Sequence, residues 1–172
     1  PRQTTTGNSP VRQPPWRPDL NQTASTEHGA VHPAKFDGLP ARVMLAAIGM
    51  QESGFSYRQQ VGGPARGYWQ FEQGGGVRGV LTHPVTSAYA KSVCQLRAVA
   101  PVESDVYAAL LTDDLLACAF ARLLLYSDSA PLPSVGDIQV SWAYYQRNWR
   151  PGRPHPDYWP SHYIAAQAAV AP

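Results

Sequence analysis

The sequence predicts a mostly α-helical fold, because three observations point the same way. The stretch from Met44 to Phe55, MLAAIGMQESGF, places apolar side chains on every face before its polar end, which is typical of a central, buried helix. Leu116, Phe120 and Leu123 fall at the i, i+4, i+7 spacing of an amphipathic helix. Convincing alternation of apolar and polar residues, as in a half-buried strand, is absent from the sequence.

Composition places the chain among globular proteins and argues against two kinds of partner. Its 172 residues are 44% hydrophobic and only 15% charged, which fits one domain with a substantial core. The net charge is +2, and the 14 Lys and Arg residues are scattered, so we expect no nucleic-acid partner. No apolar run reaches the roughly 18 residues of a membrane-spanning helix. We therefore expect no membrane span, and a monomer.

Residues 1–33 differ in composition from the rest of the chain. They are rich in Pro, Thr, Ser and Gln and hold few residues that could form a core, so we expect an extended arm or linker. His28 and His32 have i, i+4 spacing but lie in this arm without an HExxH context, so we predict no metal site. Residues 34–172 are expected to form one folded domain.

Helix boundaries are predicted from proline, glycine and capping residues. Pro40 suits the first turn of a helix that ends near Ser53. The glycine-rich residues 61–79 predict a loop that could hold a short hairpin or extended pieces. Thr112 is expected as an N-cap, followed by two aspartates that favour the helix dipole. Further helices are expected at residues 84–99, 104–111, 113–126, 134–149 and 160–171.

The two cysteines, Cys94 and Cys118, lie on separate predicted helices. Neither their spacing nor their flanking residues indicate metal or redox chemistry. Two alternatives stay open, a buried pair of free thiols and a single disulfide, and the disulfide would imply an oxidising compartment. No motif in the chain indicates a cofactor.

Glu52 is an ionisable side chain at the end of an apolar helix. A buried carboxylate is costly unless something pairs it or uses it. One interpretation is that Glu52 is an ordinary helix-end carboxylate that makes a hydrogen bond. The other is that Glu52 is a general acid, because desolvation would raise its pKa toward neutral pH. Aromatic rings and polar donors such as Gln70 hold sugars in many proteins. Aromatic residues cluster late in the chain, at Trp142, Tyr144, Tyr145, Trp149, Tyr158, Trp159 and Tyr163.

Three segments together resemble the lytic transglycosylases of the lysozyme superfamily: QESGF, GPARGYWQFE and WAYYQRNWRPG. That family typically shows Glu-Ser-x-Phe at a helix end, then a Gly-x-x-Gly-Leu-Met-Gln segment, and later a Tyr-Asn-Ala-Gly segment. The order and spacing fit residues 38–165, and GYWQFEQGGGV and NWRPGRP look most like the bacteriophage-encoded versions. The resemblance implies a lysozyme-like catalytic domain that cleaves peptidoglycan glycan strands, in a phage virion or in the host periplasm and cell wall. Other virion proteins are its candidate partners.

The resemblance also implies roles for individual residues. Glu52 matches the catalytic acid, which protonates the glycosidic oxygen between N-acetylmuramic acid and N-acetylglucosamine. Tyr145, or else Tyr144, matches the tyrosine that helps hold the intermediate, and Gln70 matches a glutamine lining the sugar site. The other residues expected at the sugar site are Ser53, Tyr68, Trp69, Glu72, Tyr144 and Trp149.

The implied mechanism needs one carboxylate, no metal and no cofactor. The substrate's acetamide attacks C1 in a substrate-assisted step, and Glu52 then takes the proton of the muramic C6 hydroxyl, which closes a 1,6-anhydro ring. Glu72 leaves a second route open, because a carboxylate facing Glu52 would allow hydrolysis by water. The alternative for Glu72 is an ion pair with Arg66 or Arg78. A glycan-binding virion component without catalysis is a further alternative.

The sequence departs from the family pattern at several places. Val61-Gly62-Gly63-Pro64 lacks the serine that often precedes the family's glutamine segment. Trp69 and Phe71 stand where the family carries Met and an aliphatic residue, so a bulkier wall is expected there. The late tyrosine segment lacks Asn-Ala-Gly.

Overall fold

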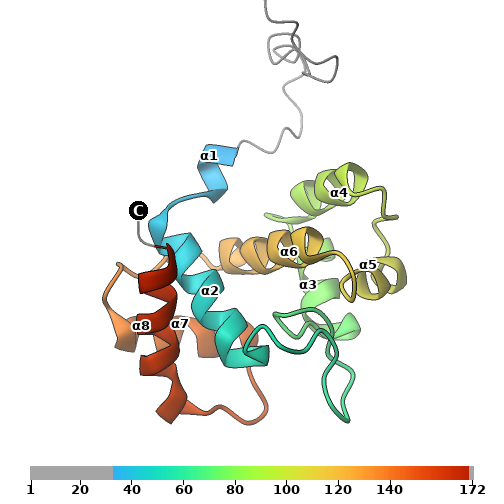
Figure 1. Ribbon diagram of the computed structural model, residues 1–172. Coiled ribbons are helices and arrows are strands. Elements are labelled where there is room, and N and C mark those ends of the chain that lie inside the picture. Colours follow the sequence, from blue (N-terminus) through green and yellow to red (C-terminus); the bar gives the residue numbers. More distant parts are fainter. Residues whose placement is uncertain (1–32, 171–172) are drawn as a thin grey trace, which may run out of the picture.

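The computed structural model describes residues 33–170. The predicted arm up to residue 32, with His28 and His32, lies outside this range. Most of the described chain is helical and it holds no strand, so the prediction of a mostly α class is confirmed (Figure 1). The α-helices are α1 (Pro33–Phe36), α2 (Leu39–Ser53), α3 (Arg78–Thr82), α4 (Ser87–Leu96), α5 (Glu103–Ala109), α6 (Asp114–Ser127), α7 (Ile138–Trp149) and α8 (Trp159–Val170). A π-helical turn, η1 (Gln73–Val77), and a 3-10 turn, η2 (Pro156–Tyr158), complete the described elements.

Helix α2 is central in the fold, as its apolar faces predicted. Proline lies in its first turn, and Gly54 ends it in the left-handed conformation, with φ 58° and its N–H donating to the Met50 carbonyl. Val43, Ala47 and Ile48 have no exposed surface. The helix packs along α8 and against α6, and Figure 1 shows α2 and α8 side by side, with α6 running away from them toward α3, α4 and α5. The end of α2, which carries Glu52, is thereby held rigidly.

The predicted N-cap of the next long helix is wrong by one residue. Asp113, not Thr112, caps α6, because its carboxylate accepts a 2.9 Å hydrogen bond from the backbone N–H of Leu116. Arg97 pairs with the same carboxylate at 2.7 Å. The cap therefore also joins α6 to the end of α4.

The glycine-rich segment contains more helix than predicted. Its extended part is limited to isolated bridges that pair Arg66 with Gln59 and with Phe71. After Phe71 the chain forms η1 and continues directly into α3. Val77 and Val80 are fully buried on this helical stretch, so packing of these side chains outweighs the poor helix propensity of the glycines.

The remaining helix boundaries differ from the predicted ones by a few residues. Helix α7 begins at Ile138 rather than residue 134, because Asp137 caps it with a 3.1 Å hydrogen bond from the Val140 N–H. The last helix, α8, runs for 12 residues, close to the predicted range of 160–171. Trp159 and Tyr163 on α8 are each 1% exposed, so buried aromatic area stabilises this helix.

Cys94 on α4 and Cys118 on α6 are both free thiols, the first buried and the second partly buried. The structure therefore favours free thiols over the disulfide. Burial raises the pKa of the Cys94 thiol to about 11. Cys94 is therefore a core side chain without thiolate chemistry near neutral pH.

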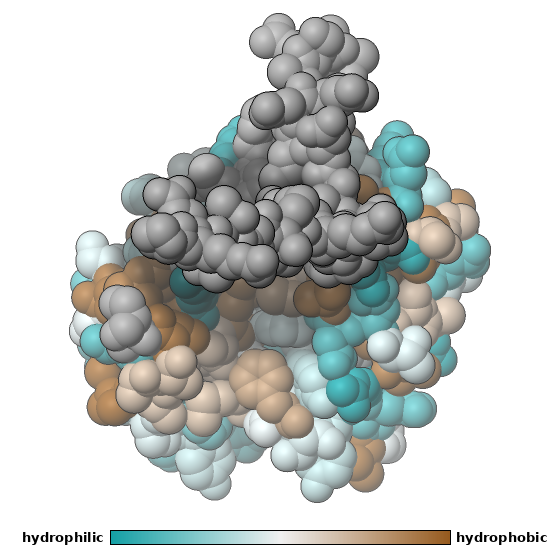
Figure 2. Space-filling view, turned by 45° about the horizontal axis from the view of Figure 1, so that its top comes forward, coloured by the Kyte–Doolittle hydropathy of each residue, from teal (hydrophilic) through white to brown (hydrophobic). Residues whose placement is uncertain are grey.

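Exposed apolar side chains come from different elements. Val61 in the glycine-rich segment, Leu96 on α4 and Leu115 on α6 are among the most exposed. Apolar and polar residues are mixed over the coloured part of the face in Figure 2, which is ordinary for a folded domain. Across residues 33–170, none of the helices has the length and apolar character needed to cross a bilayer.

Replacement of Gly67 by alanine is expected to destabilise the fold. Gly67 has φ +72°, and an added Cβ would lie 3.1 Å from the Leu110 carbonyl oxygen. Gly62 has nearly the same φ, +71°, with nothing within 4 Å of the added atom. Gly62→Ala should therefore cost about 1 kcal/mol from backbone strain alone, and Gly67→Ala about 1–3 kcal/mol more. Urea unfolding of both variants measures the difference, and equal costs would contradict the close packing at Gly67.

Candidate active site

A cavity of about 920 Å³ lies where the end of α2, the glycine-rich segment and the end of α7 meet. Glu52 reaches it from α2, Gln70 and Glu72 from the glycine-rich segment, and Tyr145 from α7. The cavity wall also includes Asn148, Trp149, Arg150 and Arg153. Residues far apart in the sequence are thus brought to one concave surface, with Glu52 in its wall.

The Glu52 carboxyl and the Tyr145 hydroxyl form the central contact of the cavity. Tyr145 Oη donates a 2.6 Å hydrogen bond to Glu52 Oε1, across 93 positions of sequence. Glu52 is partly buried, and Tyr145 is 2% exposed. The bond ties α2 to α7 and leaves the second oxygen of Glu52 for other contacts.

The environment of Glu52 raises the pKa of its carboxyl toward neutral pH. Burial raises the pKa of the Glu52 carboxyl to about 7, and the hydrogen bond from Tyr145 offsets part of that rise. Burial, with the charge of Glu52, also raises the pKa of Tyr145 well above its ordinary value. Tyr145 therefore stays a hydroxyl donor, while Glu52 is poised to give and take a proton.

Aromatic packing fixes the orientation of Tyr145. Its ring stacks on Trp159 of α8, with centroids 5.1 Å apart and an interplanar angle of 13°. Trp142 packs against both rings at 5.2 and 5.5 Å. Because these rings restrict χ1 and χ2, the hydroxyl of Tyr145 has little freedom to leave Glu52.

Ser53, Tyr68 and Trp69 hold the glycine-rich segment against α2 and do not line the cavity. Ser53 Oγ donates to the Tyr68 carbonyl at 2.8 Å. Trp69 Nε1 donates to the Leu45 carbonyl at 2.9 Å, and Trp69 is only 6% exposed. Sugar contacts were predicted for these three residues, but they support the glycine-rich segment instead. Of the two residues expected to form a bulkier wall, Phe71 lines the cavity and Trp69 does not.

Gln70 and Trp149 lie in the cavity wall, as predicted. Gln70 adopts the left-handed φ of 50°, and its side-chain amide donates to the Gly67 carbonyl at 2.8 Å. Its side-chain carbonyl is then the group available to a ligand. Trp149 Nε1 donates to the Trp69 carbonyl at 2.9 Å, so this indole braces the glycine-rich segment and offers ring surface to the cavity.

Tyr144 is not a cavity residue, and its predicted sugar contact is corrected accordingly. It is 1% exposed, and its hydroxyl donates to the Leu125 carbonyl at 2.7 Å. Successive helical residues point in directions about 100° apart, so only one of the two tyrosines can face Glu52. That residue is Tyr145.

The predicted ion pair of Glu72 with Arg66 or Arg78 is wrong. Arg78 pairs with Glu103 at 2.7 Å, and the Arg66 guanidinium lies 4.0 Å from the ring centroid of Tyr107. Glu72 is exposed and lines the cavity. A second carboxyl group therefore faces the same space as Glu52.

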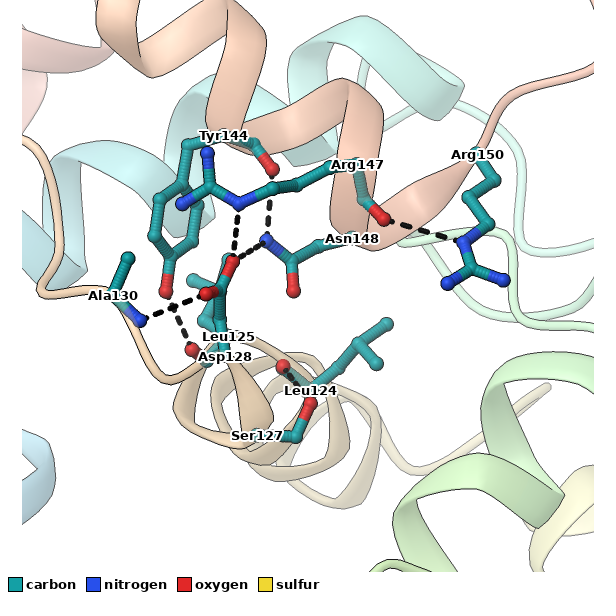
Figure 3. A network of polar contacts seen from close by, with 9 residues as sticks. All are labelled: Leu124, Leu125, Ser127, Asp128, Ala130, Tyr144, Arg147, Asn148 and Arg150. Atoms are coloured by element: carbon teal, nitrogen blue, oxygen red, sulfur yellow. Dashed lines mark hydrogen bonds and ion pairs between the residues drawn. The ribbon is translucent and has the colours of Figure 1, made fainter.

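Sequence reasoning missed the polar residues at the end of α7. Asp128 accepts hydrogen bonds from Arg147 Nε at 2.5 Å and Asn148 Nδ2 at 2.8 Å (Figure 3). Asn148 also donates to the Tyr144 carbonyl, one helical turn back. The arginines spaced three apart in RNWRPGR, residues 147–153, are the sequence feature that could have indicated these polar residues. In the part of the chain that the structure describes, no group of three metal-ligating His, Cys, Asp or Glu side chains comes together.

Removal of the Tyr145 hydroxyl should cost more stability at high pH than at low pH. At pH 8 the bond is made to an ionised Glu52 and is worth about 1.5–3 kcal/mol, whereas at pH 5 the neutral bond is worth about 0.5–1.5 kcal/mol. Urea unfolding of Tyr145→Phe at both pH values measures this. Tyr144→Phe is the matched control, because its hydroxyl bonds a backbone carbonyl and its cost should not vary with pH. A pH-independent cost for Tyr145→Phe would contradict the contact.

Glu52→Gln should stabilise the fold at alkaline pH. Because the folded state raises the pKa of Glu52 from 4.5 to about 7, the wild type loses stability as the pH rises through that window. Glutamine does not ionise, so the variant's free energy of unfolding should gain about 3 kcal/mol on the wild type between pH 4 and pH 8.

Glu103→Gln is the control of opposite sign for that comparison. The Arg78 guanidinium lowers the pKa of the Glu103 carboxyl, so the stability that it contributes is present at pH 8 and lost as the pH falls through its folded pKa. A Glu52→Gln variant that tracks the wild type at every pH would show that Glu52 is solvated.

No protein-family model, no curated protein and no solved structure matches this chain.

Proposed function

We propose that this chain is a peptidoglycan lytic transglycosylase, which cuts the β-1,4 bond between N-acetylmuramic acid and N-acetylglucosamine. One observation carries the proposal: a carboxyl group with a pKa of about 7, hydrogen-bonded by a tyrosine, in the wall of a cavity of about 920 Å³. A cavity of this size fits a sugar chain better than a single small ion. The resemblance of QESGF, GPARGYWQFE and WAYYQRNWRPG to that enzyme family supports the same reaction.

In the first step, Glu52 acts as general acid. Its raised pKa leaves a large protonated fraction at neutral pH, and it donates that proton to the glycosidic oxygen as the bond to C1 breaks. The substrate's own N-acetyl carbonyl oxygen attacks C1 and forms an oxazolinium-like intermediate. This route needs no second protein carboxylate.

In the second step, Glu52 acts as general base. The carboxylate accepts the proton of the muramic C6 hydroxyl while that oxygen attacks C1. The bond from C1 to the N-acetyl oxygen breaks at the same time, which regenerates the neutral acetamide, closes the 1,6-anhydro ring and restores the protonated acid. Tyr145 keeps one oxygen of Glu52 hydrogen-bonded through both steps. It lowers the pKa of the carboxyl enough for the proton to leave and return.

A lysozyme-like fold and a bacteriophage setting belong to the same proposal. The catalytic glutamate at a helix end, the glycine-rich segment with Gln70, and the late helix with Tyr145 follow one another in the order expected for that family. A phage protein of this kind would act on the host wall from the virion or from the periplasm, with other virion proteins as its candidate partners.

Glu72 favours a second candidate, a muramidase on the same scaffold. It lines the cavity that holds Glu52, and its predicted arginine partners pair or stack with other residues. A carboxylate so placed could orient a water molecule toward C1, which would make the reaction hydrolytic.

The products released from purified peptidoglycan test the reaction. Mass spectrometry of wild-type digests should show muropeptides with 1,6-anhydromuramic ends, and Glu52→Gln should lower their rate of release by at least about 100-fold, the usual weight of general acid–base catalysis. Glu72→Gln should leave the anhydro product unchanged.

The same experiment separates the other candidates. Reducing ends that disappear in Glu72→Gln would establish the muramidase. Absence of any product, under conditions where a known lytic enzyme cuts the same wall, would leave glycan binding as the function.

A further inference from the structure

Two arginines in the cavity wall lack the partners that the chain's other arginines have. Arg150 and Arg153 both line the cavity and are exposed. Arg150 Nε donates only to the Arg147 carbonyl, at 3.4 Å. Across residues 33–170, neither guanidinium lies in a salt bridge or over an aromatic ring.

Every other arginine in residues 33–170 has a carboxylate or an aromatic ring beside it. Carboxylate partners are Asp37 for Arg42, Asp114 for Arg58, Glu103 for Arg78, Asp113 for Arg97 and Asp128 for Arg147. Arg66 and Arg122 lie over the rings of Tyr107 and Phe36. The two arginines without such partners are thus the two that follow α7 into the cavity wall.

The fold holds this positive segment beside Glu52. Gln51, the residue before Glu52, donates its side-chain amide to the His155 carbonyl at 3.1 Å. At the other end of the segment, Asp128 pairs with Arg147. Figure 3 shows the Arg150 guanidinium lying away from Asp128, joined to the network only through the hydrogen bond from its Nε to the Arg147 carbonyl. Asp128 neutralises Arg147, so the unpaired positive charge on this wall belongs to Arg150 and Arg153.

We propose that Arg150 and Arg153 bind the carboxylates of the peptidoglycan stem peptide, which makes the cavity selective for strands that still carry peptides. This inference rests on the proposed function. The stem peptide is attached through the lactyl group at C3 of the muramic ring whose C1 bond is cut, so it leaves the glycan strand at the sugar that reacts. Guanidinium groups bind carboxylates with paired, charge-assisted hydrogen bonds.

Phosphate groups of wall polymers could also bind these arginines. The substrates of the test must therefore distinguish peptide carboxylates from wall phosphates. Peptidoglycan freed of phosphate polymers by hydrofluoric acid provides peptide-bearing strands. The same material treated with an amidase that removes the stem peptides provides bare strands, which keep the lactyl carboxylate of each muramic ring but lack the carboxylates of the peptide. Arg150→Gln/Arg153→Gln is the test variant, and Arg42→Gln/Lys91→Gln, at exposed positions outside the cavity, is the charge-matched control.

The quantity to measure is the ratio of kcat/KM on peptide-bearing strands to that on bare strands. The wild type and the control should prefer peptide-bearing strands by roughly tenfold, since two exposed charge pairs contribute about that factor. The test variant should lose the preference through KM. An equal ratio in the wild type and the test variant, or an effect seen only on phosphate-bearing walls, would overturn the inference.

A binding measurement tests the role of Arg150 and Arg153 independently of whether the protein cuts glycan. Calorimetry with Glu52→Gln protein compares a GlcNAc–MurNAc ligand that carries its stem peptide with the same disaccharide without it. Tighter binding of the peptide-bearing ligand, lost when Arg150→Gln/Arg153→Gln is added, supports the inference even if the wild type cuts no glycan. Equal affinities for the two ligands would overturn it even if the enzyme is active.

Discussion

The hydrogen bond between Tyr145 and Glu52 is the contact on which the rest of the site depends. It joins the end of the central helix α2 to α7. Helix α8 packs along α2 and stacks its Trp159 on Tyr145 of α7. Burial pushes the pKa of Glu52 up while the tyrosine draws it back to about 7. A fully solvated carboxyl would be ionised, and a fully apolar site would hold the proton too tightly to release it. The intermediate value makes one residue suitable as both acid and base.

Several parts of the fold and site were predictable because local rules decide them. Helix α2 follows from an apolar run with proline in its first turn and glycine after its end, and its apolar faces correctly predicted its central place. Glu52 was identifiable because an ionisable residue at the end of such a helix is costly without a role. Gln70 and Tyr145 followed from the family resemblance, and both line the cavity with Glu52.

What could not be predicted depends on contacts between distant parts of the chain. The ion pair of Arg78 with Glu103, for example, joins residues 25 positions apart. The glycines of η1 suggested a loop, but the buried Val77 holds that turn in helical form. The sequence suggested Trp69 as a sugar-binding ring, but its indole N–H donates to a backbone carbonyl of α2.

The measurement that tests the central claim most directly is a titration of the Glu52 carboxyl in the wild-type protein. The side-chain carboxyl carbons of glutamate can be labelled with carbon-13, and Glu52→Gln assigns the signal by its loss. A midpoint near pH 7 is the predicted result, since burial exceeds the stabilisation of the charged form by Tyr145. A midpoint near the ordinary glutamate value of 4.5 would contradict it, because Glu52 would then hold almost no proton to donate at neutral pH.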